Sequence, residues 1–172
     1  MLENPELLNN QAVELAQNGS YTEAIACFMR AISIQKNNAN LWYNLGVTYR
    51  DSGNAEHAKM AFLQALDIDP VDECTIEALS EICFQKSEFV EAMTYCWEGL
   101  DLNPFNSHLW NTLGAVNFNM ENFEDASSAF EQALFLNPYY YDALYNLRDT
   151  YIELKNFAGA EVCQQKMKEI KR

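Results

Sequence analysis

The chain has little basic charge and few of the residues that most often carry catalysis. Of its 172 residues, 11 are Lys or Arg and 25 are Asp or Glu, which gives a net charge of -14. Binding to DNA or RNA depends on Lys and Arg that neutralise phosphates, so this balance argues against a nucleic-acid partner. There are only two histidines, His57 and His108, and there is no nucleophile motif, glycine-rich phosphate loop or metal-ligand spacing. We therefore expect a protein that is not an enzyme and needs no cofactor or metal.

Long apolar runs and paired cysteines are also missing. No segment has the ~18 unbroken apolar residues that a membrane-spanning helix requires, so we expect no membrane insertion. Residues 1–10 are acidic and polar, unlike a signal or transit peptide. Five cysteines are an odd number at scattered spacings, and four of them lie among apolar residues, as buried thiols do in a reducing compartment. These features predict a cytoplasmic location.

The chain does contain an internal repeat. Its best copy, residues 40–70, has the form W-x2-L-G-x2-Y, then A-x3-F-x2-A, then proline, carried by Trp42, Leu45, Gly46, Tyr49, Ala58, Phe62, Ala65 and Pro70. Steps of 34 residues place Pro104 and Pro138 at the site of Pro70, and two steps place Trp110 at the site of Trp42. Five copies in one register, with no insertion, account for residues 5–172.

This pattern resembles the tetratricopeptide repeat (TPR) signature. The resemblance implies an all-α fold, an α-α superhelix or TPR solenoid of about ten antiparallel helices, with helices A and B in each repeat. The expected single array, 5–172, divides into repeats at about 5–38, 39–72, 73–106, 107–140 and 141–172. In the second repeat we expect helix A over 40–51 and helix B over 55–68. Gly53 would supply the positive φ of the turn, and Gly46 with Ala58 the closest crossing of the two helices.

The first copy has Leu8 and Gln11 at the sites of Trp42 and Leu45, and three further copies also depart from the signature. The third has smaller or polar residues at four signature sites, namely Ser80, Cys83, Cys96 and Gly99. The fourth has Asn117 where the second has Tyr49, and the fifth has Arg148 at the small-residue site of Gly46. Trp97, next to these small residues of the third copy, either fills the space they leave or is exposed as a second contact surface.

The resemblance also implies that the free faces of the A helices line a concave groove that binds peptides. The candidate site residues on these faces are Asn10, Tyr43, Asn44, Val47, Arg50, Glu77, Glu81, Phe84, Asn111, Phe118, Tyr145, Asn146 and Asp149. One recurring site carries Asn10, Asn44 and Asn146, with Ala78 and Thr112 in the other two repeats. An asparagine amide has both donors and an acceptor, so such a row can bind the backbone of an extended peptide. The alternative is that each amide bonds its own helix or water.

Aromatic and acidic side chains accompany the asparagines. Tyr43, Phe84, Phe118 and Tyr145 are either anchors for apolar side chains or partly buried between the A helices. Seven acids share this face with a single strong base, Arg50. Cochaperones of this family grip a carboxylate tail with a clamp that includes lysine, and no register of this chain provides that lysine. We therefore expect a basic or apolar extended segment of a partner protein, although the acidity alternatively serves only solubility.

The C-terminal end of the chain leaves further functions open. Five of the eleven basic residues lie in the last eighteen positions, namely Lys155, Lys166, Lys168, Lys171 and Arg172. The last helix, about 157–170, either caps the array itself or contacts another chain, so a homo-oligomer through this helix is one alternative. The predicted function is thus a protein-interaction scaffold or adaptor. The alternatives are a self-assembling structural subunit, a secretion-type chaperone, or the targeting part of a larger enzyme.

Overall fold

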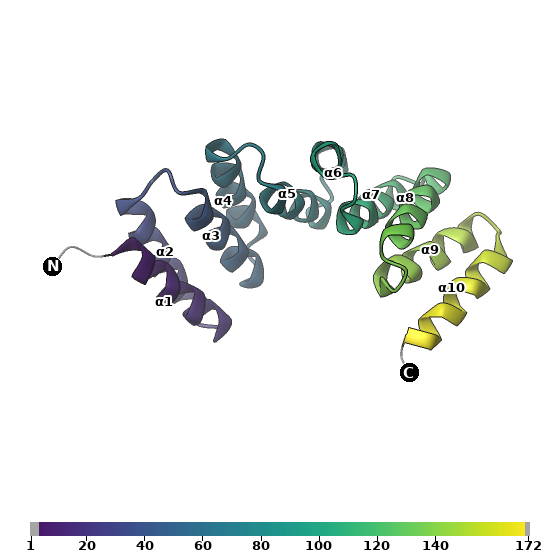
Figure 1. Ribbon diagram of the computed structural model, residues 1–172, viewed down its shortest axis with the longest axis horizontal. Coiled ribbons are helices and arrows are strands. Elements are labelled where there is room, and N and C mark those ends of the chain that lie inside the picture. Colours follow the sequence, from purple (N-terminus) through teal and green to yellow (C-terminus); the bar gives the residue numbers. More distant parts are fainter. Residues whose placement is uncertain (1–3, 171–172) are drawn as a thin grey trace. The chain divides into compact units, whose positions relative to one another are not determined.

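The protein is built from helices throughout the part that the structure describes. A computed structural model describes residues 4–170, and this range contains ten α-helices and no strand (Figure 1). The helices are α1 (Pro5–Gln17), α2 (Tyr21–Ile34), α3 (Ala39–Asp51), α4 (Ala55–Ile68), α5 (Glu73–Gln85), α6 (Phe89–Leu102), α7 (Ser107–Asn119), α8 (Phe123–Leu136), α9 (Tyr141–Glu153) and α10 (Phe157–Ile170). The all-α prediction is confirmed, and the helix bounds expected for the second repeat agree within one residue with those of α3 and α4.

The helices form two compact units, with the boundary between Lys86 and Ser87. In the first unit, α1 packs on α2 and α3 on α4, while α2 contacts α3, α4 contacts α5, and the A helices α1 and α3 also touch. In the second unit, α6 contacts α7, α7 packs on α8, α8 contacts α9 and α9 packs on α10, while the A helices α7 and α9 touch. Within each unit, the B helices α2, α4, α6 and α8 therefore contact the A helix of the repeat that follows.

Asparagines and tight turns set the ends of many helices. Asn38, Asn54 and Asn106 accept hydrogen bonds from backbone N–H groups in the first turn of the helices that follow them, which stabilises those N-termini. Each turn from helix A to helix B contains one residue with positive φ, and these residues recur every 34 positions: Gly19, Gly53, Ser87, Glu121 and Lys155. The prediction for Gly53 is confirmed, with φ of 81°. The last three turns take the same left-handed conformation without glycine.

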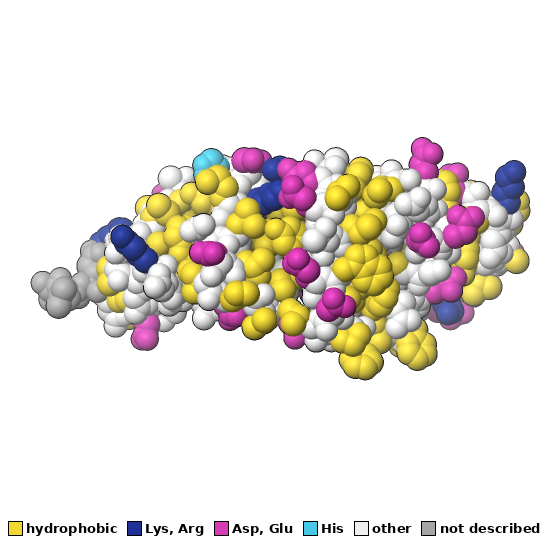
Figure 2. Space-filling view, turned by 90° about the horizontal axis from the view of Figure 1, so that it is seen from above, with side chains coloured by type: hydrophobic (Ala, Val, Ile, Leu, Met, Phe, Trp, Pro, Cys, Tyr) yellow, Lys and Arg dark blue, Asp and Glu magenta, His cyan; other side chains and the backbone are white. Residues whose placement is uncertain are grey.

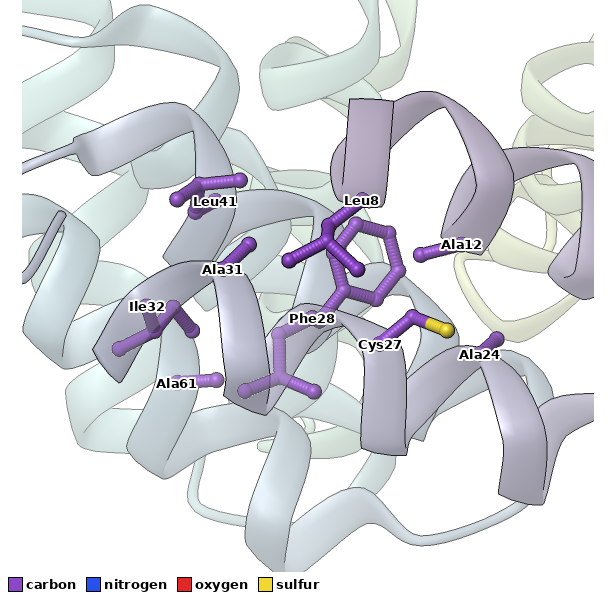
Figure 3. Close-up of a cluster of buried hydrophobic side chains, with 10 residues drawn as sticks. Leu8, Ala12, Ala24, Cys27, Phe28, Ala31, Ile32, Leu41 and Ala61 are labelled. Carbon is purple, nitrogen blue, oxygen red and sulfur yellow. The ribbon is translucent and has the colours of Figure 1, made fainter. Parts of the chain in front are cut away.

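In the first, second and fourth repeats, the core forms where a small residue of helix A lets a phenylalanine ring of helix B approach. In the first repeat, Leu8 and Ala12 of α1 lie against Phe28 of α2, all of them buried (Figure 3). In the second, a Cβ built on Gly46 would lie 2.6 Å from the ring of Phe62, and Gly114 has the same relation to Phe130 in the fourth. The prediction that a small residue is required at the crossing of helices A and B is therefore confirmed.

The departures from the signature have local structural explanations. Ser80, Cys83 and Cys96 are fully buried, and four of the five cysteines are buried free thiols while Cys74 is exposed. Asn117 is buried and satisfies its amide by donating from Nδ2 to the carbonyl of Leu113 at 3.0 Å. Arg148 lies across the ring of Tyr145, 4.2 Å from its centroid, so its charge stays near the surface.

Candidate functional site: the exposed faces of the A helices

All thirteen candidate site residues lie on A helices, and the two units divide them. The first unit holds those of α1, α3 and α5, namely Asn10, Tyr43, Asn44, Val47, Arg50, Glu77, Glu81 and Phe84. The second holds those of α7 and α9, namely Asn111, Phe118, Tyr145, Asn146 and Asp149. We call these surfaces the first and second A-helix faces. A single groove that runs through both units stays a prediction.

On the first A-helix face, asparagines of two repeats are hydrogen-bonded to one another. Asn44 Nδ2 donates to Asn9 Oδ1 at 3.0 Å, which joins α3 to α1. Asn9 Nδ2 in turn donates to Asn10 Oδ1 at 3.5 Å. Beside this network lies a pocket of about 300 Å³ whose walls are mostly amide side chains: Pro5, Glu6, Asn9, Asn10, Gln35, Asn38, Asn40 and Leu41. The surface at the start of this face therefore presents several amide donors and acceptors together.

The second A-helix face repeats the same bond. Asn146 Nδ2 donates to Asn111 Oδ1 at 3.1 Å, which joins α9 to α7. Both bonds connect residues 35 positions apart, from the recurring asparagine site of one repeat to the position before that site in the preceding repeat. The recurring site groups Asn10, Asn44 and Asn146 in the sequence, but it does not reveal their hydrogen-bond partners. The sequence pattern that marks each bond is a pair of asparagines 35 residues apart, one residue more than the length of the repeat.

Tyr43 is a partly covered aromatic of the first face. Its ring lies 5.7 Å from that of Phe62, and its side chain is half-buried. Burial raises the pKa of the Tyr43 hydroxyl, and the nearby Cys74 thiol adds to the rise. Burial likewise raises the pKa of Cys74, so at neutral pH both groups are protonated and can act as hydrogen-bond donors.

The charged candidates of both faces make ion pairs. Arg50 Nε donates to Asp51 at 3.0 Å, and its Nη1 lies 3.9 Å from a carboxylate oxygen of Glu81 on α5. Arg148 Nη2 donates to Asp149 at 2.6 Å. Among the acids of these faces, Glu6, Asp142 and Glu153 are exposed to solvent. Figure 2, which views the molecule from above Figure 1, shows extensive hydrophobic areas with scattered acidic groups and few lysine or arginine side chains.

The remaining aromatic candidates differ in exposure. Tyr145 is 47% exposed on α9, with the guanidinium of Arg148 over its ring. Phe118 is half-buried, packs edge-on against Phe123 at 5.4 Å and contacts the core of the second unit. Phe84 on α5 is also half-buried. Tyr145 is thus the most accessible of these rings, and the role of each as an anchor stays a prediction.

Neither histidine has the neighbours of a metal site. Within residues 4–170, neither His57 nor His108 belongs to a group of three ligand-type side chains close enough to share an ion. The His108 ring instead lies 5.0 Å from that of Tyr140, with a contact of 3.2 Å from Nδ1 to the hydroxyl.

In the described range, no helix is both long and apolar enough to cross a bilayer.

Sequence profiles place the chain in a family. Profiles described as TPR repeat or tetratricopeptide repeat match residues 13–53, 39–72 and 112–165. The chain belongs to the tetratricopeptide repeat family. Among curated proteins it is 35% identical over 66 residues to the mouse protein O-mannosyl-transferase TMTC3, a match that covers 38% of this chain and 7% of that protein. It is also 26% identical over 85 residues to anaphase-promoting complex subunit 3 of Schizosaccharomyces pombe, covering 49% of this chain and 13% of that one.

Solved tetratricopeptide repeat structures resemble it over nearly its whole length. A MamA fragment from Desulfovibrio magneticus RS-1 matches with a TM-score of 0.91 at 18% identity, covering 100% of this chain and 97% of that one. PilF of Pseudomonas aeruginosa matches with a TM-score of 0.84 at 18% identity, covering 97% of this chain and 78% of that one. At such identities the likeness establishes the fold. Membership of the family supports a general role as a protein-interaction scaffold.

Proposed function

We propose that this protein is a non-enzymatic scaffold that binds an extended, basic or apolar segment of a partner protein along its A-helix faces. The observation that carries the proposal is the hydrogen bond from Asn44 to Asn9, repeated from Asn146 to Asn111. In both units, the same position of the repeat holds an asparagine amide in a fixed orientation.

These amides are suited to a peptide backbone. An asparagine side chain has two N–H donors and one carbonyl acceptor. The bond to the preceding repeat uses one N–H of Asn44, which leaves the second N–H and the carbonyl for a ligand. Because the amide is already oriented, binding costs less side-chain entropy than it would for a freely rotating group. An extended peptide presents alternating N–H and C=O groups that can pair with such an amide.

Charge and apolar area favour a basic or apolar ligand. The exposed acids Glu6, Asp142 and Glu153 attract Lys or Arg of a ligand, and this attraction weakens with salt. Tyr43 and Tyr145 add accessible ring surface next to the amides, where apolar side chains can pack.

A peptide array tests this proposal directly. The full chain would be applied to an array of basic and apolar peptides, alongside the double variant Tyr43→Ala with Asn44→Ala. The control is Met60→Ala with Gln64→Ala, which changes two exposed residues of the B helix α4. We expect the first variant to lose the peptides that the native chain and the control retain. Unchanged binding by the first variant would contradict the proposal.

Self-association through α10 is a second candidate. This helix exposes two apolar side chains, Phe157 (65%) and Val162 (56%). It also carries the exposed Lys166 and Lys168, whereas the chain as a whole has a net negative charge. Of the basic residues grouped in the sequence analysis, Lys171 and Arg172 lie outside the described residues. Light scattering over a range of concentrations tests this candidate: a mass that rises with concentration, and does not rise in Val162→Glu, supports it. A constant monomer mass contradicts it.

A further inference from the structure

A second pocket lies in the second unit, and none of its lining residues is among the candidates of the A-helix faces. It has a volume of about 430 Å³ and is lined by residues of α6, α7 and α8. Its walls include Trp97 of α6, Trp110, Leu113 and Asn117 of α7, and Asp125 of α8. We call it the Trp97 pocket.

Asn117, where the fourth repeat departs from the signature, lies in the wall of this pocket. In the second repeat the same position is Tyr49, whose ring packs 5.1 Å from that of His57. In the fifth it is Tyr151, whose hydroxyl donates to Glu131 at 2.8 Å. Tyr151 lines a pocket of about 380 Å³ at the equivalent place one repeat later, formed by residues of α8, α9 and α10, so a ring at this position does not close the space. Asn117 is smaller and turns back to the Leu113 carbonyl, so the wall of the Trp97 pocket at this position is an amide rather than a ring.

Two tryptophans form an aromatic wall of this pocket. Trp97 is 49% exposed, and its ring meets that of Trp110 nearly at a right angle, 84°, with centroids 6.0 Å apart. Trp110 is fixed by a hydrogen bond of 2.9 Å from its Nε1 to the carbonyl of Pro104. An exposed indole held against a fixed one offers a π surface that attracts cations.

The charge around the pocket has one sign. The exposed carboxylate of Asp125 belongs to the pocket, and Glu124 precedes it in the first turn of α8. From Ser87 to Leu147 the chain has no lysine or arginine, while acids recur along it. A cation that enters the pocket therefore meets a carboxylate and an indole without competition from a nearby basic residue of the same stretch.

We propose that the Trp97 pocket binds an arginine side chain of a partner protein. A guanidinium is planar and weakly hydrated, so it can stack on the indole of Trp97 while its N–H groups bind Asp125. A lysine ammonium is strongly hydrated and cannot stack in this way. This site is separate from the A-helix faces, so its failure would leave the proposed groove function intact.

Indole signals in the NMR spectrum of the full chain test this proposal. The chain has three tryptophans, and Trp42 occupies in the second repeat the position of Trp110, with the same type of bond from Nε1 to a backbone carbonyl. The probe is the peptide acetyl-Gly-Arg-Gly-Arg-Gly-amide, compared with versions that carry lysine or neutral citrulline. We expect the arginine peptide to shift the signals of Trp97 and Trp110 but not that of Trp42. The lysine peptide should bind about tenfold more weakly, and the citrulline peptide should cause no shift.

Three variants separate binding from folding. Trp97→Leu removes the exposed indole and should abolish the shift of the Trp110 signal. Asp125→Asn should weaken binding about fivefold, whereas Glu124→Gln removes the same charge one residue away and should not. A shift of Trp42 equal to that of Trp97, equal binding of the lysine or citrulline peptide, or unchanged affinity of Asp125→Asn would overturn the proposal. The Asp125 result decides the question if Trp97→Leu does not fold.

Discussion

The side-chain amide of Asn44 is bound to that of Asn9 across two successive A helices, with 3.0 Å between Nδ2 and Oδ1. The two residues lie 35 positions apart, and Asn146 has the same relation to Asn111 in the second unit. Each bond links neighbouring repeats and at the same time orients a polar group on the exposed face. One interaction thus contributes to stability and to the candidate binding surface.

Removing this bond should cost measurable stability. We expect Asn44→Ala to lower the free energy of unfolding by about 1 kcal/mol, since the bond is partly buried and Asn9 loses its donor. Urea titration of the native chain and the variant measures this difference. Asn40→Ala, an exposed residue of the same helix, is the control and should change stability far less. Equal losses in the two variants would show that the Asn44–Asn9 bond contributes nothing specific.

The left-handed turn residues predict opposite effects for two substitutions. Gly53 has φ of 81°, where glycine carries no steric penalty, while Glu121 adopts φ of 62° with a side chain. Gly53→Ala should therefore destabilise the chain by about 1 kcal/mol, and Glu121→Gly should stabilise it by up to about 1 kcal/mol. Thermal melts of both variants measure the signs. Two shifts of the same sign would contradict the assignment of these turns.

A methyl group on Gly46 should damage the core of the second repeat. Alanine favours a helix over glycine by about 1 kcal/mol, but the new Cβ would lie 2.6 Å from the fully buried ring of Phe62. We expect the clash to outweigh the helix preference, with a net loss of about 1–2 kcal/mol. In a Phe62→Leu background the ring is absent, and the same substitution should no longer destabilise. Chemical denaturation of the four chains gives the coupling.

Tyr151 predicts a pH dependence at alkaline pH. Burial and the hydrogen bond to Glu131 raise its pKa to about 12 from the model-compound value of 10.0. The folded chain holds this proton more tightly than the unfolded chain, so the stabilisation is fully present below pH 10 and is lost as pH rises through about 12. Ultraviolet titration of the phenolate should show one tyrosine ionising near pH 12 that is missing in Tyr151→Phe. Glu131→Gln should lower that pKa, and no change would contradict the proposed cause.

The recurring residues made the helices and their pairing predictable from sequence. Trp42, Gly46 and Phe62 recur in phase as Trp110, Gly114 and Phe130, and in both repeats the ring lies close against the glycine. The turn at Gly53 was predictable because glycine readily adopts the positive φ that such a turn needs. The turns at Glu121 and Lys155 were not, because their side chains give no sign of a positive φ.

The site was only partly predictable. The candidate residues were placed on the A helices by register alone, but register does not reveal side-chain partners. The Asn44–Asn9 bond joins two different positions of the repeat, so aligning the repeats does not pair these residues. The Arg148–Tyr145 contact depends on the conformation of the long arginine side chain. Asn117 was recognised as a departure from the signature, but the Trp97 pocket that it lines is formed by residues of three helices.

Photocrosslinking from the first A-helix face tests the central claim most directly. A photoreactive phenylalanine analogue would replace Val47 of α3 in one full-length chain and the exposed Met60 of α4 in another. Each chain would be irradiated with a partner recovered from the native host, and the crosslinked peptides would be identified by mass spectrometry. We predict that position 47 crosslinks to an extended segment rich in basic or apolar residues, and that position 60 does not. Crosslinks from position 60 alone would show that the A-helix face is not the binding surface.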